Sequence, residues 1–364
     1  SGTVIDCDFA SSGKIGIHIK TTGTTTGASQ AVCQFQLENF ALKFTGSATD
    51  SVGLKIGESG KQVNGDKNSR VSNVNIAAFH GHQIHLISAR YVAFDNVVAT
   101  VRSSGTTTNA LVVENDSSSR FTGDITFFQS VFVGSGEASQ DTITLSSSGT
   151  NSEVRGVRFI GCIGYYGRNC LVIYAASGGQ TGDIFVQTCQ FDGAAVIDSD
   201  VKTAVLISAN GSGSLVSGVS VNNCYAVQWQ DYGVQVTTAS SGIVANIAIT
   251  GNYIGLCESI GIAIAGDSSG VNVVGNTLFD CGTGGTAGAI TFGDSTGLFN
   301  CVGNTHYNNS ATRTAGYVVS VSESSGGVTT EFTVTNNVGH AATAAVFDNT
   351  TTGNKTVSGN WMRA

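Results

Sequence analysis

Three nearly equivalent lines of sequence follow one another between residues 216 and 293, and they constrain the fold more than any other feature. They read VSGVSVNNCYAVQWQDYGVQVTT from Val216, VANIAITGNYIGLCESIGIAIAG from Val244 and VNVVGNTLFDCGTGGTAGAITFG from Val271. Each line has an alternating apolar strand, a corner with Asn or Cys, a short polar passage, and a second alternating strand. A fixed period with two strands per repeat is the sequence signature of a solenoid.

The same period extends over the whole chain. The first apolar residue of each second strand recurs from Ile17 to Val346 at intervals of 27 to 37 residues. Parallel strands need crossover connections, which are almost always right-handed, so we predict a right-handed parallel β-helix of roughly twelve coils. Because nothing interrupts the period, we expect one all-β domain over residues 1–364. The sequence begins without Met and in mid-coil, so we expect a fragment of a longer chain.

The composition agrees with tight coils and excludes some partners. The chain has 48 Gly and no Pro, as expected where corners need left-handed residues and interior strands need every backbone donor. Charged residues make up 12% and the net charge is −8, without Lys/Arg clusters, which argues against nucleic acid. The sequence contains no run of 18 apolar residues, so it predicts no membrane-spanning helix. A neutral or polyhydroxylated ligand is compatible with these values.

The cysteines follow the coil period rather than a disulfide pattern. Cys162, Cys189 and Cys224 each lie three residues after an apolar strand residue, and Asn252 and Asn276 keep the same offset. We therefore predict a buried column in which Cys and Asn alternate, with neither disulfides nor zinc ligands.

Three histidines, His80, His82 and His85, crowd one corner. A His-x-His pair can bind a metal, but we identify neither a third ligand nor a carboxylate partner in the sequence. We therefore interpret them as stacked polar corner residues, and we expect no metal site and no cofactor.

The best candidates for chemistry lie in the polar passages just before the second strands. Asp200, Asp231 and Glu258 lie five, three and four residues before the first apolar residue of three consecutive second strands. Residues at equal offsets in successive coils stand about 4.8 Å apart. We therefore predict that these three carboxylates are catalytic.

Glycosidic cleavage needs two carboxyl groups that flank the scissile bond. One coil of separation would bring Asp231 and Glu258 near the roughly 5 Å of a retaining pair, and two coils would bring Asp200 and Glu258 near the 6.5–9.5 Å or so of an inverting pair. Aromatic faces would stack on sugar rings, and cations would hold an acidic sugar. The predicted substrate-binding residues are Arg168, Tyr166, Trp229, Tyr232, Lys202 and Asp198.

Asp and Glu are also common in polar passages that simply face solvent, so a structural role is the alternative. A second acidic set, Glu114, Asp116, Asp267 and Asp294, follows the second strands. The pair Glu114 and Asp116 is several coils away from the pair Asp267 and Asp294, so we do not expect the two pairs to cooperate within one subunit.

Lines such as VANIAITGNYIG and VNVVGNTLFDC, with corner residues Asn252, Asn276, Asn304 and Asn337, resemble the pectate-lyase-like right-handed β-helix superfamily. Within it, the Gly/Ser/Thr richness, the cysteine usage and the missing N-terminus most resemble the receptor-binding domain of bacteriophage tailspikes. This resemblance implies a homotrimer on a virion tail, extracellular, that cleaves capsular polysaccharide or lipopolysaccharide O-antigen with Asp/Glu pairs. The alternatives are a lyase acting on a uronate-containing polymer and a carbohydrate-binding rod without catalysis.

Overall fold

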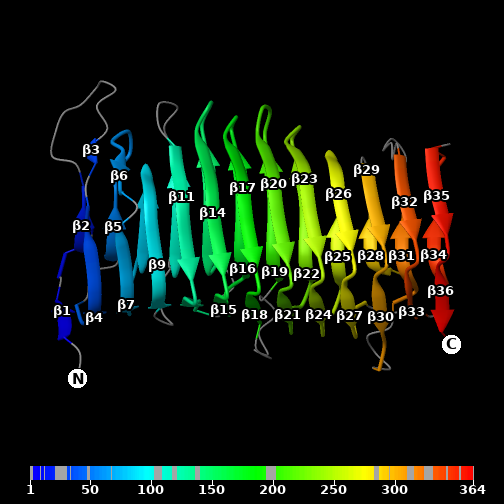
Figure 1. Cartoon of the computed structure of the whole chain (residues 1–364), viewed down its shortest axis with the longest axis horizontal. Coiled ribbons are helices and arrows are strands. Elements are labelled where there is room, and N and C mark those ends of the chain that lie inside the picture. The colour runs from blue at the N-terminus through cyan, green and yellow to red at the C-terminus, as the bar shows by residue number, and fades with distance from the viewer. Residues whose placement is uncertain are drawn as a thin grey trace.

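In the computed structural model, the alternating segments form parallel strands that stack coil upon coil along one axis, with the strands across that axis (Figure 1). The structure describes residues 3–8, 10–11, 13–20, 31–32, 34–46, 50–66, 68–101, 109–116, 121–135, 140–193, 202–282, 287–294, 296–309, 315–323, 331–341, 343–351 and 354–363. These residues contain no helix, and hence none that could cross a membrane. The predicted parallel β-helix is confirmed.

Each regular coil contributes strands to three stacks, and every strand pairs in parallel with its equivalents in the neighbouring coils. The 12-stranded sheet consists of β2 (Ile15–Ile19), β5 (Val52–Ile56), β8 (Ile84–Ile87), β10 (Leu111–Asn115), β13 (Ile143–Ser148), β16 (Asn169–Ala176), β19 (Thr203–Asn210), β22 (Tyr232–Ala239), β25 (Ile260–Ile264), β28 (Gly288–Phe292), β31 (Tyr317–Val321) and β34 (Ala344–Asp348).

The other two stacks share a 24-stranded sheet. The long-strand stack consists of β3 (Ala31–Val32), β4 (Gln36–Phe44), β6 (Val63–Asn64), β7 (Arg70–Ala77), β9 (Ala89–Thr100), β11 (Phe121–Phe128), β14 (Glu153–Ile160), β17 (Gln180–Gln187), β20 (Leu215–Asn222), β23 (Ile243–Thr250), β26 (Ser268–Val274), β29 (Thr296–Val302), β32 (Glu331–Thr335) and β35 (Asn354–Ser358). The C-terminal parts of β4, β7 and β9 continue past the corner into the short-strand stack. The short-strand stack consists of β1 (Thr3–Cys7), β12 (Val131–Val133), β15 (Ile163–Tyr165), β18 (Gln190–Asp192), β21 (Tyr225–Val227), β24 (Tyr253–Gly255), β27 (Thr277–Phe279), β30 (Thr305–Tyr307), β33 (Val338–His340) and β36 (Trp361–Arg363), together with the C-terminal parts of β4, β7 and β9.

Inward-facing residues of the three stacks form one apolar column along the axis. Phe94, Phe127 and Phe159 occupy the same register position on β9, β11 and β14, and their rings stack with centroid distances of 4.7 and 5.0 Å. Ile249 on β23 is likewise fully buried. Because each such side chain contributes about 1.5–3 kcal/mol on burial, the column holds the coils together.

The corner between the long and short strands has one residue in the left-handed region in every coil. The φ values lie between 46° and 66° for Asn39, Asn73, Asn96, Gln129, Gly161, Thr188, Asn223, Gly251, Gly275, Gly303, Asn336 and Gly359. Gly and Asn adopt this conformation most readily, and they supply ten of these twelve positions. A repeated left-handed residue therefore explains why the chain is rich in Gly at this corner.

Beside that corner runs the predicted column of Cys and Asn, and its burial is confirmed. Cys224 Sγ donates to the Val186 carbonyl at 3.6 Å, and in the next coil Asn252 Nδ2 donates to the Val221 carbonyl at 2.9 Å. Both side chains thus satisfy a carbonyl of the preceding coil. All eight cysteines in the described part of the chain are buried and free, so the thiols are not bridged there.

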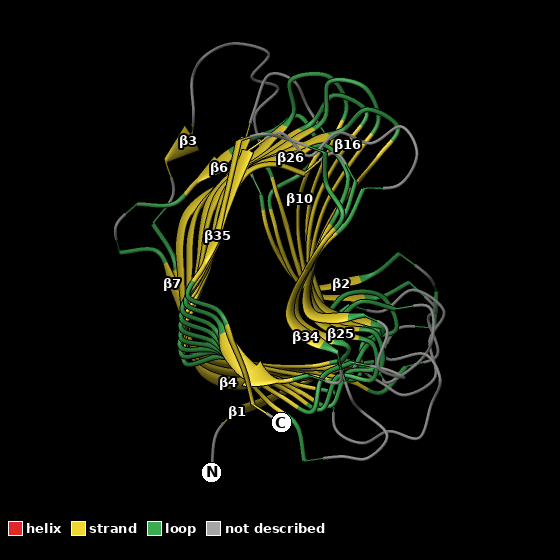
Figure 2. Ribbon diagram, turned by 90° about the vertical axis from the view of Figure 1, so that its right-hand side faces the viewer, coloured by secondary structure: helices red, strands yellow, loops and turns green. Residues whose placement is uncertain are grey.

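The 12-stranded sheet differs from the other two in its curvature. Figure 2 views the coils end on and shows that β2, β10, β25 and β34 belong to a wall that bends toward the interior. The outer face of this sheet is therefore concave. The loops that lead into its strands lie along one border of that face.

Candidate active site

The predicted site residues lie where the short-strand stack leads into the 12-stranded sheet, and we call this border the entry corner. It comprises the loop ends at residues 140–142, 166–168, 202, 228–231 and 256–259, which precede β13, β16, β19, β22 and β25. The register Asn169–Thr203–Tyr232–Ile260 aligns four of these loops across consecutive coils. Side chains far apart in sequence therefore become neighbours along the axis.

Arg168, Lys202 and Asp231 stand in one column on three consecutive coils. The Lys202 amide donates to the Arg168 carbonyl at 2.6 Å, and the Asp231 amide donates to the Lys202 carbonyl at 2.9 Å. Lys202 Nζ lies 3.7 Å from Asp231 Oδ2, with 37% and 39% of the two side chains exposed. An ion pair this exposed stabilises the fold by at most about 1 kcal/mol, so both groups remain accessible to a ligand.

Glu258 lies on the coil after Asp231 but not directly above it. Its amide donates to the Trp229 carbonyl at 3.0 Å, whereas the Asp231 carbonyl accepts from the Ile260 amide at 2.9 Å. Glu258 is thus staggered by one residue relative to Asp231, and its side chain is exposed. The two carboxylates are on adjacent coils as predicted, and their role as a catalytic pair stays a prediction.

Two tyrosines frame this column. Tyr232 is half-buried beside Asp231, and burial together with the Asp231 charge raises the pKa of its phenol. Tyr166 has a φ of 58°, its carbonyl accepts from Thr142 Oγ1 at 2.8 Å, and its ring tilts against Tyr165 at a centroid distance of 6.2 Å. Both rings lie at the entry corner, so they stay candidates for sugar binding.

The prediction for Trp229 is wrong. Its indole is fully buried, and Nε1 donates to the Phe191 carbonyl at 3.3 Å. An inward ring offers no face to a sugar, so Trp229 supports the corner from inside. Asp198 and Asp200 lie outside the described residues, and their predicted roles stay predictions.

One acidic residue of the entry corner, Asp141, is absent from the sequence-based predictions. Asn169 Nδ2 donates to Asp141 Oδ1 at 2.7 Å, and Asn109 Nδ2 donates to its backbone carbonyl at 2.7 Å. Burial raises the pKa of Asp141, with the Asn169 hydrogen bond and the Arg168 charge acting in the opposite direction. A carboxyl group that keeps its proton to higher pH can donate it, so Asp141 can act as an acid near Arg168.

The histidine corner is more organised than the sequence indicates. His85 Nε2 lies 2.7 Å from Glu114 Oε1, and the His82 ring packs edge-on against His85 at 5.3 Å. Burial lowers the pKa of His82 to about 4, and the hydrogen bond to His85 lowers the pKa of Glu114. Glu114 is therefore the carboxylate partner that the spacing did not identify. Within the described residues, no group of three or more His, Cys, Asp or Glu is placed to hold a metal ion.

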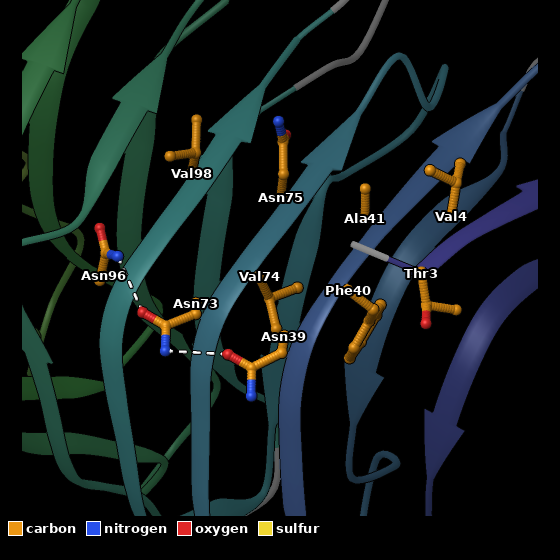
Figure 3. A pocket seen from close by; sticks show the side chains of 10 residues that line it. All are labelled: Thr3, Val4, Asn39, Phe40, Ala41, Asn73, Val74, Asn75, Asn96 and Val98. Carbon is orange, nitrogen blue, oxygen red and sulfur yellow. Dashed lines mark hydrogen bonds between the residues drawn. The ribbon is translucent and has the colours of Figure 1, made fainter. Parts of the chain in front are cut away.

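A shallow depression of about 450 Å³ lies on the outer face of the first coils (Figure 3). Three exposed amides form a ladder along it: Asn73 Nδ2 donates to Asn39 Oδ1 at 3.1 Å, and Asn96 Nδ2 donates to Asn73 Oδ1 at 2.9 Å. Neutral side chains such as Val4 and Val98 complete the lining. With no acid or base in its lining, this depression offers no group for proton transfer.

Comparisons with known proteins show no family for this chain. No family model matches the sequence, and no curated protein matches it. Among solved structures, the chain resembles the Dettilon tailspike protein, with 10% identity and a TM-score of 0.39, over 83% of this chain and 56% of that one. DFA-IIIase from Arthrobacter chlorophenolicus A6 is 11% identical with a TM-score of 0.39, over 88% of this chain and 77% of that one. The periplasmic alginate epimerase AlgG is 10% identical with a TM-score of 0.37, over 85% of this chain and 77% of that one.

Proposed function

We propose that this chain binds a bacterial surface polysaccharide, capsule or O-antigen, and cleaves it by glycoside hydrolysis at the entry corner. The observation that carries the proposal is the column of Arg168, Lys202 and Asp231 on consecutive coils, followed on the next coil by Glu258. Opposite charges are thus grouped along a border of the concave outer face of the 12-stranded sheet. A shared fold does not fix an activity, so the proposal depends on these residues.

The chemistry assigns one role to each kind of group. One carboxyl group, from Asp231 or Glu258, protonates the leaving glycosidic oxygen, and the other attacks the anomeric carbon or activates a water. The guanidinium of Arg168 and the ammonium of Lys202 bind the carboxylate of an acidic sugar. Tyr166 and Tyr232 contribute ring faces to neighbouring sugar units. Asp198 and Asp200 belong to the same proposal as binding and catalytic residues.

A lyase is the second candidate, and the adjacency of Arg168 and Lys202 favours it. Two cations on neighbouring coils can neutralise a uronate carboxylate while a base removes the adjacent proton and the glycosidic bond breaks by elimination. Tyr232 is a poor base for this step, because burial and the nearby Asp231 raise the pKa of its phenol. We therefore rank hydrolysis above elimination.

The proposal includes a homotrimer on a phage tail, outside the host cell. Large apolar side chains on the outer face of the long-strand stack support association, since Phe128 on β11 is 41% exposed and Phe185 on β17 is 43% exposed. Light scattering on the purified protein measures the oligomer directly. A monomeric mass at micromolar concentration would contradict the trimer.

The activity is tested by incubating the protein with purified capsule and O-antigen polysaccharides and counting new reducing ends. We expect Asp231→Asn and Glu258→Gln to reduce the rate by about a hundredfold to ten-thousandfold, the range for loss of a general acid or base. Asp267→Asn is the matched control, because Asp267 is exposed but lies beyond the far end of β25. Full activity in both corner variants would refute the assignment.

The products separate the alternatives in the same assay. Hydrolysis yields saturated ends, whereas elimination yields unsaturated sugars that absorb ultraviolet light. Retention of a polysaccharide without any new ends would support a binding rod and would refute the proposed cleavage.

A further inference from the structure

Four aromatic residues follow one another on consecutive short strands and form what we call the aromatic stripe. Tyr225 on β21 and Tyr253 on β24 occupy the same register position, and Phe279 on β27 and Tyr307 on β30 share a position two residues further along. Successive coils are about 4.8 Å apart, so the stripe extends over roughly 14 Å of the axis. Residues two apart on a strand point to the same side, so all four rings lie on one face.

Three rings of the stripe are exposed, and two of them stack on each other. Tyr225, Tyr253 and Tyr307 are 44%, 36% and 43% exposed. The Tyr225 and Tyr253 rings are parallel to within 9° at a centroid distance of 5.1 Å. A methyl group at Gly255 would lie 3.3 Å from Tyr253 Cε1, so the ring lies close over the glycine. The Tyr225 and Tyr253 rings therefore form a continuous surface rather than two isolated side chains.

The surface between the rings is uncharged. The remaining positions on the same side of these four strands are Val227 and Gly255, which are buried, and Thr277 and Thr305, which are half-buried. Aromatic rings edged with hydroxyl groups suit the apolar faces and hydroxyls of sugar rings. A nucleic acid would need cations that these positions lack.

The stripe leads directly to the entry corner. Tyr225 lies six residues before Asp231, and Tyr253 lies five residues before Glu258, in the strands that continue into those loops. A linear polymer lying along the stripe would thus run beside the carboxylates of two successive coils. This continuity favours a polysaccharide as the occupant over a second protein chain.

We propose that the aromatic stripe is a binding track for a polysaccharide chain, separate from the residues that cleave it. The identity of the ligand rests on the proposed function, while the binding role does not require cleavage. The track holds several sugar units at once, so its contribution grows with the length of the polymer and vanishes for a fragment that occupies the entry corner alone.

Binding is tested by affinity electrophoresis in gels that contain purified capsule or O-antigen polysaccharide. We expect the double substitution Tyr225→Ala with Tyr253→Ala to weaken retention by about tenfold or more, and Tyr253→Phe to keep it, because the ring provides the contact. Gln187→Ala is the control, since Gln187 is exposed but lies on the long-strand stack and has no part in the proposed association surface. An unchanged melting temperature shows that each variant is folded.

Kinetics give a second readout. In the double variant we expect KM for the long polymer to rise by about tenfold, while kcat and the KM for a short fragment stay unchanged. Unchanged retention in the double variant, or no retention of the unmodified protein by any polysaccharide, would overturn the track. So would a change in the oligomeric mass of the double variant, because that result identifies the stripe as a contact between copies.

The two proposals fail in different ways. Loss of retention in the double variant with no new reducing ends from the unmodified protein would refute cleavage and support the track. Cleavage that is insensitive to the stripe substitutions would support the site and refute the track.

Discussion

Replacing Asn276 by Ala tests whether the buried amide column holds adjacent coils together. Asn276 is almost fully buried, and its Oδ1 accepts from the backbone amide and from Nδ2 of Asn252, both at 2.9 Å. Its Nδ2 donates to the Ile249 carbonyl and to Asn304 Oδ1, again at 2.9 Å. The substitution removes these four hydrogen bonds and brings in no water to replace them.

Each lost bond is worth about 0.5–1.5 kcal/mol, so we expect Asn276→Ala to lower the free energy of unfolding by about 2–6 kcal/mol. Asn276→Cys should cost less, because Cys224 and Cys189 hold equivalent positions and donate to the carbonyl of the preceding coil. Urea unfolding followed by far-ultraviolet circular dichroism measures both differences.

The outer ladder supplies the control for this prediction. Asn73 also bridges two amides, Asn39 and Asn96, but it is exposed, so water replaces the lost partners (Figure 3). Its φ of 52° would strain Ala, whereas Gly fits there, as Gly251 does in an equivalent corner. We expect Asn73→Gly to cost less than about 1 kcal/mol. Equal losses for the inner and outer variants would refute the reasoning that burial gives the amide column its strength.

Three further outcomes are expected. Burial lowers the pKa of His82 to about 4, so the unfolded chain binds a proton that the folded chain excludes. The free energy of unfolding should therefore fall by up to about 3 kcal/mol as the pH drops from 6.5 toward 4. His82→Asn should flatten this pH dependence in thermal scans, and an unchanged slope would count against the role of His82. Ile249→Ala should cost about 2–5 kcal/mol by leaving a cavity in the core, which urea unfolding checks, and a loss below 1 kcal/mol or so would contradict the packing described. Cys189 should resist thiol reagents in the native protein, because the hydrogen bond with Cys162, which lowers its pKa, is outweighed by the Cys224 contact and burial, which raise that pKa to about 12; rapid labelling without denaturant would show the column to be open.

The repeat predicts the fold because the coil period is written directly in the sequence. Val216 and Val244 begin two of the repeat lines and are register partners in the structure. The offset of Cys224 and Asn252 likewise predicts their shared column, since both fall at a corner of fixed geometry. Where the backbone repeats, counting residues along the sequence is sufficient to predict which residues become neighbours.

The candidate site was harder to predict because its loops vary in length and direction. The offset of Trp229 could not show on which side of the chain the indole lies, and the ring proves to be buried. His85 and Glu114 meet on neighbouring strands two register positions apart, a diagonal contact that comparison of equal offsets does not find. Asp141 occupies the position of Asn169 one coil earlier, which its place two residues before Ile143 could have indicated.

The register of the long strands has a consequence for how such a molecule can change its length. Val271 and Phe299 are partners on β26 and β29, so removal of residues 271–298 joins Gly270 to Phe299 in the same phase and deletes one turn of 28 residues (299 − 271). That excision would take Phe279 out of the stripe and bring Tyr307 next to Tyr253, while Asp231 and Glu258 stay on adjacent coils. Loss of a single residue would instead put the wrong side chains inside. The length of glycan that the stripe contacts could therefore be adjusted in whole turns of the β-helix, independently of the catalytic residues at the entry corner.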